Sequence, residues 1–231
     1  EGNQKAANHV VMLRNTSKGH SLYTTFQLQK NFVDGILKGL YLNGSYSFGQ
    51  SRGVTDGTSS VATSAWKYRA ALDGNAEEVG YTAGSFDGRL LLSASYTANW
   101  SKYAATSFGL IYQRYRPFRY SYCYNGDANG DSQFSNDLMY IPANFDEVKD
   151  HLLPGDFDSQ EDAWKAMNAF IEQDPYLSKH RGEYAERNGA VAPFANQLDL
   201  SVSHDIKIYQ KNGRSHTLRF SFNIANFLNL L

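Results

Sequence analysis

The sequence predicts an all-β fold, in which about seven antiparallel strands cross a membrane as part of a transmembrane β-barrel. Three observations predict it. Apolar and polar residues alternate in one segment after another, which is typical of strands with two different faces. Several segments run for about 11 residues, whereas globular strands average about 5–6 and a tilted membrane strand needs about 9–11. The connections are alternately short and long, as in outer-membrane barrels.

The composition agrees with this fold and excludes several others. The 231 residues include 16 Tyr, 14 Phe and 19 Gly but one Cys, which excludes an internal disulfide framework or a CxxC motif. The mean hydropathy is −0.51, and no apolar run approaches the ~18 residues of a membrane helix. A barrel strand exposes only alternate residues to lipid, so its mean hydropathy stays low. The net charge of −1 gives no general attraction to nucleic acid.

The alternation predicts the strands in order along the chain. Within Leu90–Trp100, for example, Leu92 and Ala94 lie on one face and Ser93 on the other. The second face is rich in Ser, Asn, Gln and Thr, as a water-filled lumen requires. The predicted strands are Val10–Arg14, Ser21–Phe32, Leu40–Phe48, Leu90–Trp100, Phe108–Tyr122 with an Arg-rich interruption, Gln197–Ile208 and Leu218–Ile224.

The connections predict which side of the membrane each strand end faces. Short turns belong on the periplasmic side and long loops on the extracellular side. The short connections are Val33–Lys38, Ala104–Ser107 and Gln210–Ser215, and the long ones are residues 51–87 and 125–195. Aromatic girdles are expected at both borders, with Trp100 and Tyr103 at one and Phe118–Tyr124 at the other.

Some basic residues do not fit the apolar face. Arg114, Arg116 and His204 have the same parity as their apolar neighbours. A charge facing lipid at mid-bilayer would cost roughly 2–4 kcal/mol. We therefore expect a β-bulge that switches faces near Arg114, or a position at the headgroup level. Arg114, Arg116 and Arg119 at the outer rim suit lipopolysaccharide phosphates or interfacial anchoring better than nucleic acid.

The second long loop is acidic and contains a candidate metal site. It has 14 of the 23 acidic residues but five Lys or Arg. Asp127, Asn129, Asp131 and Asp137 are oxygen donors at spacings that can wrap a Ca²⁺ ion. The match to an EF-hand loop is incomplete, since Ser132 replaces the Gly and Leu138 the bidentate Glu. The alternative is an Asx-turn network that folds the loop without metal.

Residues 158–173 of this loop are expected to form a short surface helix. Asp158 or Ser159 can cap it, with an acidic residue three positions later, and Asp174-Pro175 ends it. Its apolar stripe is expected to pack on the loop itself and not on a partner. The stripe consists of Trp164, Met167, Phe170 and Ile171.

No pattern in the chain indicates an enzyme. The six His residues are scattered, and no metalloprotease, nucleophile-elbow, phosphate-loop or dinucleotide-binding motif is present. Carboxylates are abundant in the long loop, but nothing selects an acid/base pair. The prediction is therefore a protein without catalytic residues.

Taken together, several motifs resemble one receptor family. Five motifs follow one another along the chain: Gly126-Asp-Ala-Asn-Gly-Asp131, Asn136-Asp-Leu-Met-Tyr-Ile-Pro142, Arg181-Gly182, Pro193-x-x-Asn196-x-Leu-Asp-Leu200 and Phe222-Asn-Ile-Ala-Asn-Phe-Leu-Asn229. Their order resembles the last third of TonB-dependent outer-membrane receptors of Bacteroidota, of the Oar-like type. The resemblance covers nearly the whole chain. It implies that residues 1–231 form the C-terminal segment of a barrel of about 22 strands.

The resemblance also implies a function. Such receptors import a bulky nutrient, such as an oligosaccharide or a peptide, across the outer membrane of a Gram-negative bacterium. An N-terminal plug and the TonB complex would act through regions upstream of Glu1, and a surface lipoprotein is a further expected partner. Ligand contacts are expected in the extracellular loops 51–87 and 125–195, with no residue selected. Outer-membrane lipid and lipopolysaccharide would surround the strands.

Apart from an enzyme, which would need a measured turnover traceable to a loop carboxylate, two other functions remain open at this point. One is a non-transporting outer-membrane barrel with a structural or adhesive role, whose acidic loop binds calcium. The other is a soluble β-sandwich that binds glycans by stacking sugars on its aromatic residues. Absence of a plug and TonB box in the full-length gene would favour the first, and solubility without detergent would favour the second.

Overall fold

The computed structural model describes residues 11–57, 59–209 and 215–230. The chain divides into two compact units, which are described separately. The sheet unit consists of Leu22–Gly49, Phe86–Pro117 and Pro193–Leu231. The connecting unit consists of Glu1–Ser21, Gln50–Ser85 and Phe118–Ala192.

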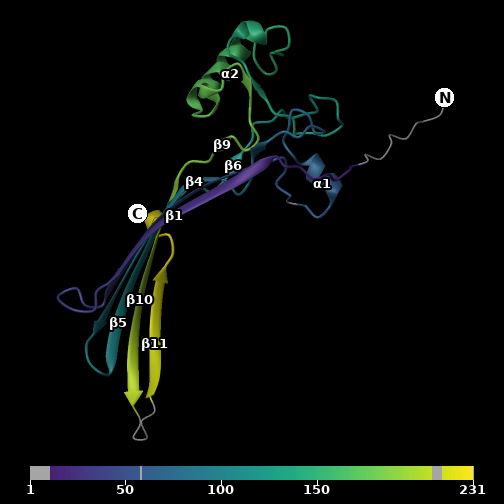
Figure 1. The fold of residues 1–231 in the computed structure, drawn as a ribbon. Helices are drawn as coiled ribbons and strands as arrows, with labels where there is room; N and C mark the ends of the chain where they lie inside the picture. The colour runs from purple at the N-terminus through teal and green to yellow at the C-terminus, as the bar shows by residue number, and fades with distance from the viewer. Residues whose placement is uncertain (1–10, 58, 210–214, 231) are drawn as a thin grey trace. The chain divides into compact units, whose positions relative to one another are not determined.

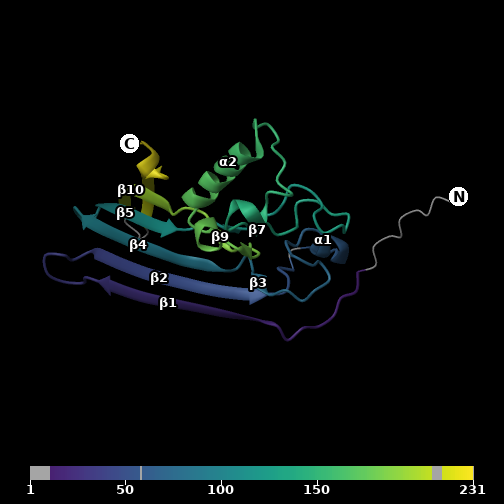
Figure 2. The same cartoon turned by 90° about the horizontal axis from the view of Figure 1, so that it is seen from above.

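Six long strands form one antiparallel sheet in the order β1-β2-β4-β5-β10-β11, and the two-residue strand β3 pairs with β2. Figure 2 shows β1, β2, β4 and β5 side by side. The long strands have 10 to 15 residues, well above the globular mode of about 5–6. The bounds are β1 Gly19–Asn31, β2 Leu40–Gly53, β3 Gly80–Tyr81, β4 Phe86–Asn99, β5 Ala104–Tyr115, β10 Ala195–Tyr209 and β11 Ser215–Ile224.

The prediction of a mostly β fold with antiparallel sheets is confirmed, without a closed barrel in the part of the chain that the structure describes. Within the described residues β1 and β11 each have one neighbour, so the sheet is open. Three predicted boundaries are wrong. Val11–Arg14 is not a strand, Val10 lying outside the described residues, and Ala104–Ser107 is the start of β5 instead of a turn. Strand β5 ends at Tyr115, so Phe118, Tyr120 and Tyr122 do not continue it.

The turns between the long strands are short. Two hydrogen bonds close the first turn: Gly39 N–H donates to Phe32 O and Phe32 N–H donates to Leu40 O, at 2.9 Å each. The second is closed by Trp100 N–H donating to Ala104 O at 3.0 Å. Antiparallel strands allow such tight turns. Both long connections join the sheet at its other end. There the end of β5, Tyr115, pairs with Arg89 near the start of β4 and with Ala195 at the start of β10.

A bulge interrupts the pairing of β2 with β4. The register between β2 and β4 shifts between Ser47 and Gly49. A Cβ at Gly49 would lie 2.1 Å from Tyr23 Cδ1, so only glycine fits against the ring of Tyr23, which stacks on Phe86 with centroids 6.0 Å apart. A bulge bends a strand and increases its twist.

The connecting unit is built from short elements. No described helix is long and apolar enough to span a membrane. The strands β6 and β9 form one two-stranded sheet and β7 and β8 another. The bounds are α1 Ala62–Lys67, β6 Arg119–Tyr120, β7 Tyr140–Ile141, η1 Phe145–Glu147, α2 Gln160–Gln173, η2 Leu177–Lys179, β8 Glu183–Tyr184 and β9 Ala190–Val191; η3 Phe227–Leu230 belongs to the sheet unit. Figure 1 labels both helices, with α1 in blue and α2 in green.

Helix α2 forms close to the predicted residues. Its N-cap is Ser159, whose Oγ accepts from the Asp162 backbone N–H at 3.1 Å. The last helical residue is Gln173, before Asp174-Pro175. The stripe packs on its own unit, as expected, through Ile171 and Met167. The buried core around it contains Ile141, Ile171, Leu177 and Ala185, with Tyr122, Met139, Met167 and Tyr176 against it.

Candidate functional site

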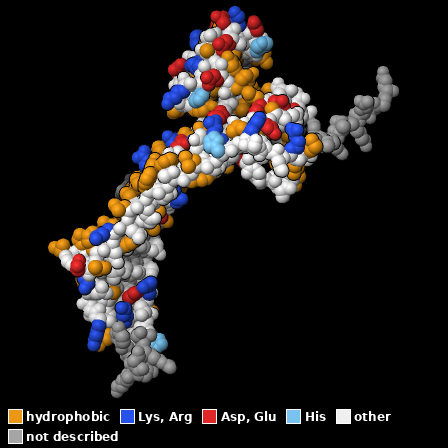
Figure 3. All heavy atoms as spheres, in the orientation of Figure 1, with side chains coloured by type: hydrophobic (Ala, Val, Ile, Leu, Met, Phe, Trp, Pro, Cys, Tyr) orange, Lys and Arg blue, Asp and Glu red, His pale blue; other side chains and the backbone are white. Residues whose placement is uncertain are grey.

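One face of the long-stranded sheet is apolar across the strands. The register sets Leu40 beside Tyr96, Tyr96 beside Phe108, and Phe108 beside Val202. Residues directly opposite in an antiparallel pair share a face, so the predicted alternation is confirmed. Figure 3 shows hydrophobic side chains at the surface of this sheet. The face includes Leu42, Leu90, Leu92, Ala94, Leu110, Tyr112, Leu198, Leu200, Ile206, Leu218, Phe220, Phe222 and Ile224.

The opposite face is polar and its side chains are hydrogen-bonded across strands. Hydrogen bonds between side chains follow the strand pairing because opposite Cβ atoms lie about 4.5–5.5 Å apart. Arg219 makes two bonds to Asp205, at 2.6 and 2.8 Å. The other pairs are Thr25–Ser47 at 2.9 Å, Gln27–Asn43 at 2.8 Å, Thr97–Ser107 at 3.0 Å, Arg89–Gln113 at 2.9 Å and Gln113–Gln197 at 3.2 Å.

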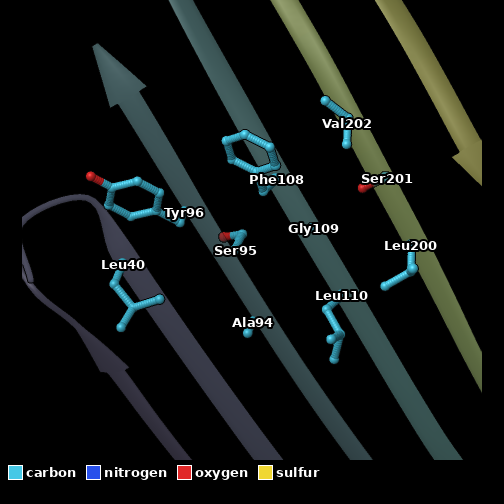
Figure 4. Close-up of a pocket in the computed structure, with 10 residues that line it drawn as sticks. All are labelled: Leu40, Ala94, Ser95, Tyr96, Phe108, Gly109, Leu110, Leu200, Ser201 and Val202. Atoms are coloured by element: carbon cyan, nitrogen blue, oxygen red, sulfur yellow. The ribbon is translucent and has the colours of Figure 1, made fainter. Parts of the chain in front are cut away.

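The apolar face has a shallow hollow of about 330 Å³. Figure 4 shows the side chains around it, which come from β2, β4, β5 and β10. Ala94 is small, so the larger Leu40, Tyr96 and Leu110 leave space beside it. Nothing polar on this face reaches into the hollow, since Ser95 and Ser201 have the parity of the opposite face.

The apolar face ends in polar side chains at the turn end of the sheet. Trp100 Nε1 donates to Thr106 Oγ1 at 2.7 Å, and Thr106 Oγ1 lies 2.8 Å from His204 Nδ1. His204 therefore has a partner on the apolar face, which satisfies one of its ring nitrogens. The predicted aromatic border at Trp100 and Tyr103 is exposed here.

At the other end of the sheet, the bulge predicted near Arg114 is absent. Strand β5 pairs without interruption with both neighbours up to Tyr115, so no face switch occurs and Arg114 stays on the apolar face. Its guanidinium carbon lies 4.5 Å from the ring centroid of Phe194, and that of Arg116 lies 4.2 Å from the same ring. Such cation–π contacts keep the charge at the edge of the face. Arg116 also pairs with Asp87 at 3.5 Å.

In the connecting unit, Arg187 joins segments from both long connections. Its side chain is buried, at 5% exposure, and donates to Val54 O at 2.5 Å and to Gly53 O. Arg69 similarly donates to Val54 O at 3.1 Å and Gly74 O at 2.6 Å. Burial lowers the pKa of both guanidinium groups. Because these donors are used on backbone carbonyls, the pair has a structural role.

An aromatic cluster lies on the same unit. Tyr122 stacks on Tyr176 with centroids 6.2 Å apart, and its hydroxyl donates to Asp174 Oδ2 at 2.6 Å. Burial, followed by this hydrogen bond, raises the pKa of Tyr122. Burial also raises the pKa of Tyr176 to about 12.

A second aromatic site brings the two connections together. Arg52 and Arg119 lie 4.3 and 4.1 Å from the ring centroid of Tyr81, and Arg52 also pairs with Glu186. These residues are half-buried. Because the two guanidinium groups lie over the Tyr81 ring, its faces are used within the protein, and the site presents charge and the edge of the ring.

The predicted metal ligands lie in one loop, where they bind backbone N–H groups. Asp127 Oδ1 accepts from Gly130 N–H at 2.7 Å, and Asn129 Oδ1 accepts from Asp131 N–H at 2.9 Å. Asp137 Oδ2 reaches back to Ala128 N–H at 2.6 Å. This is the Asx-turn network of the alternative prediction. Among the described residues, no group of three His, Cys, Asp or Glu is arranged for a metal.

Sequence reasoning missed several residues of these sites. Arg187, Tyr81 and Arg52 are in no motif, and their partners lie far away in the chain. Alternation identified the faces of the strands because each strand contains its own signal. A guanidinium bound to distant carbonyls leaves no such local signal.

No family model, no curated protein and no solved structure matches the chain.

Proposed function

We propose that this chain is part of an outer-membrane β-barrel transporter, which imports a bulky nutrient such as an oligosaccharide or peptide with energy from the TonB complex. The observation that carries the proposal is the two-faced sheet of long strands. Its apolar face is exposed along its length, and its polar face is hydrogen-bonded across strands.

An exposed apolar face of this size needs a cover. Phe26 is 65% exposed, Leu28 80% and Phe222 65%. Soluble monomers rarely expose contiguous apolar patches larger than a few hundred Å². From Leu198 to Ile206 the apolar face of β10 spans about nine residues, close to the roughly 9–11 that a tilted strand needs to cross a bilayer. Lipid acyl chains are the proposed cover, and the hollow beside Ala94 offers them an apolar surface.

The polar face supports a water-filled interior. Its Ser, Asn, Gln and Thr side chains suit water and hydroxylated solutes equally. At the border, Arg114, whose guanidinium group packs on Phe194, is the proposed contact of an anionic headgroup such as a lipopolysaccharide phosphate.

The edges of the sheet support a larger barrel. Within the described residues β1 and β11 are each paired on one side. Unpaired N–H and C=O groups cost several kcal/mol each in hydrocarbon, so spanning sheets close on themselves. Further strands must therefore complete this sheet. A total of about 22 strands, a plug and a TonB box are part of the proposal through the family resemblance.

The import step rests on the resemblance, with support from the connecting unit. That unit combines segments of both long connections, which are the proposed extracellular loops. Arg52 and Arg119, which both pack on Tyr81, give this unit a positively charged cluster that a sugar or peptide carrying an anionic group could contact. A surface lipoprotein that closes over the bound nutrient remains a proposed partner.

The two alternatives differ in what they require. A soluble sandwich needs a second sheet over the apolar face, and the remaining described strands are pairs of two-residue strands. A non-transporting barrel shares the two-faced sheet, so the sheet does not distinguish it from a transporter. A measurement of nutrient uptake distinguishes the two.

The test is uptake by cells with and without the gene. Fluorescent oligosaccharides and peptides of about 1–2 kDa would be offered to cells, with and without a protonophore. We expect loss of uptake of at least one substrate on deletion, and the same loss with the protonophore. Unchanged uptake of the whole panel, with the protein in the outer membrane, would support the structural barrel instead. Recovery of the protein in the soluble fraction would contradict the membrane assignment itself.

A further inference from the structure

We propose that the loop 127–137 binds a calcium ion, with Asp127, Asn129, Asp131 and Asp137 as its side-chain ligands. The acidic residues alone do not carry this, because their visible partners are backbone N–H groups and the three carboxylates are not gathered around one point; calcium binding would draw them together. The additional observation is that the Asp137 carboxylate is buried and that one of its oxygens has no hydrogen-bond partner.

Asp137 is a buried carboxylate without a cation. It is 3% exposed, and its Oδ1 is buried with no hydrogen-bond partner. Its Oδ2 accepts from the backbone N–H of Ala128 and Asn129 at 2.6 and 3.3 Å, so the carboxyl group is directed into the loop that contains Asp127 and Asp131. A buried charge needs a charged partner or a metal, and no described ion pair includes Asp137.

The chain around the loop offers no cationic side chain. There is no Lys or Arg between Arg119 and Lys149. Within the loop, Gln133 Oε1 and Asn136 Oδ1 are two more buried oxygens without a partner. Carboxylate and amide oxygens are the ligands that Ca²⁺ prefers, at six to eight positions and in flexible geometry. These two oxygens have no hydrogen bond that a metal would have to replace.

The backbone of the loop is compatible with a bound ion. Ser132, at the position where an EF-hand has Gly, has φ of 65°, the left-handed conformation that the sharp turn requires. Each loop carboxylate or amide that accepts a backbone N–H retains lone pairs for a metal. The loop is also accessible, because Gly130, Asp131 and Ser132 line an open hollow of about 450 Å³.

Calcium would compensate three carboxylates that lie close together in the chain. Asp127, Asp131 and Asp137 contribute three negative charges to an 11-residue segment. A divalent cation removes most of their repulsion and ties Asp137 to the loop. The inference is independent of transport, because binding is measured on the purified protein.

The test uses the full-length protein in detergent, stripped with EGTA and titrated with CaCl₂ by calorimetry. We expect one calcium per chain. The variant D127N/D131N removes two charges. The new amide at position 131 keeps an oxygen for the Gln133 N–H, whereas the one at position 127 keeps one of the two Asp127 oxygens that accept backbone N–H groups. Its fold is therefore checked by circular dichroism, and calcium binding should weaken at least tenfold. D137N should weaken binding to a similar degree.

The matched control is D150N/D156N. It removes the same charge from exposed positions of the same connection, and its calcium affinity should equal that of the wild type. Absence of binding at 1 mM calcium in the wild type would overturn the proposal, as would equal loss in the control. Magnesium binding as tight as calcium binding would also overturn it. Calcium should, in addition, slow proteolytic cleavage at 125–137 in the wild type and not in D127N/D131N.

Discussion

At the scale of single residues, buried charges organise the connecting unit. Arg187 and Arg69 share the carbonyl of Val54 as an acceptor, and no carboxylate is needed between them. Charge-assisted hydrogen bonds to backbone carbonyls are worth about 1.5–3 kcal/mol each. Arg187 is therefore a main link between the segments around Val54 and Gly80.

The first prediction concerns this link. Arg187→Lys keeps the charge but replaces a planar fork by a single ammonium group, so at least one carbonyl loses its partner. We expect a loss of about 1.5–3 kcal/mol in the free energy of unfolding of the connecting unit, measured by denaturant titration. Arg14→Lys, at an exposed position, should change it by less than about 0.5 kcal/mol. Equal effects of the two variants would contradict the structural role.

A second prediction concerns acid stability. Burial acts to raise the pKa of Asp174, but hydrogen bonds from Tyr122 Oη and from the backbone N–H groups of Leu177 and Tyr176 outweigh it and lower the pKa. A lowered folded-state pKa adds stability that is present above the unfolded value of about 3.9 and is lost as pH falls through the folded value.

The measurement compares Asp174→Asn with the wild type at pH 7 and pH 3. The variant should be less stable at pH 7, and its stability should fall less than that of the wild type between the two pH values. Asp150→Asn, an exposed position on the same connection, is the control and should keep the wild-type pH dependence. A wild-type pH dependence in Asp174→Asn would refute the assignment.

At the scale of elements, the two faces of one strand should respond oppositely to charge. Val202 lies near the middle of the apolar face of β10, opposite Phe108 and Phe222, and Ser203 is the next residue on the polar face. In the proposed membrane setting, Val202→Arg should cost about 2–4 kcal/mol. Ser203→Arg should cost much less, because its charge would face water.

The measurement is folding of both variants of the full-length protein into lipid vesicles, followed by urea titration. Adjacent positions control for strand propensity and for local backbone geometry. Equal stability of Val202→Arg and Ser203→Arg would mean that lipid does not cover the apolar face.

At the scale of the whole molecule, the exposed apolar face predicts behaviour on fractionation. The full-length protein should remain in the membrane pellet after carbonate extraction and should precipitate when detergent is diluted below its micelle concentration. The physical reason is the continuous apolar surface, which water does not solvate favourably. Recovery in the carbonate supernatant would be the contrary result, and a peripheral lipoprotein of the same cells serves as the control.

How much could be predicted from the sequence depends on the range of each interaction. The faces of the strands, the position of α2 and its Ser159 cap are local patterns, and the structure contains them. The resemblance of the motifs, and transport with it, stays a prediction. Of the two possibilities for Arg114, the bulge is absent and the position at the headgroup level stays a prediction. Its contact with Phe194, about 80 residues away, is beyond any local pattern.

The sequence by itself determined an all-β antiparallel fold with one apolar and one polar face, because period-two alternation directly encodes which face each residue occupies. The tertiary structure alone decided where strands end, that a bulge lies at Gly49 and none near Arg114, and that Arg187 and Tyr81 meet partners far away in the chain. These features depend on contacts between residues far apart in the chain, whose free energy exceeds local preference and leaves no periodic trace.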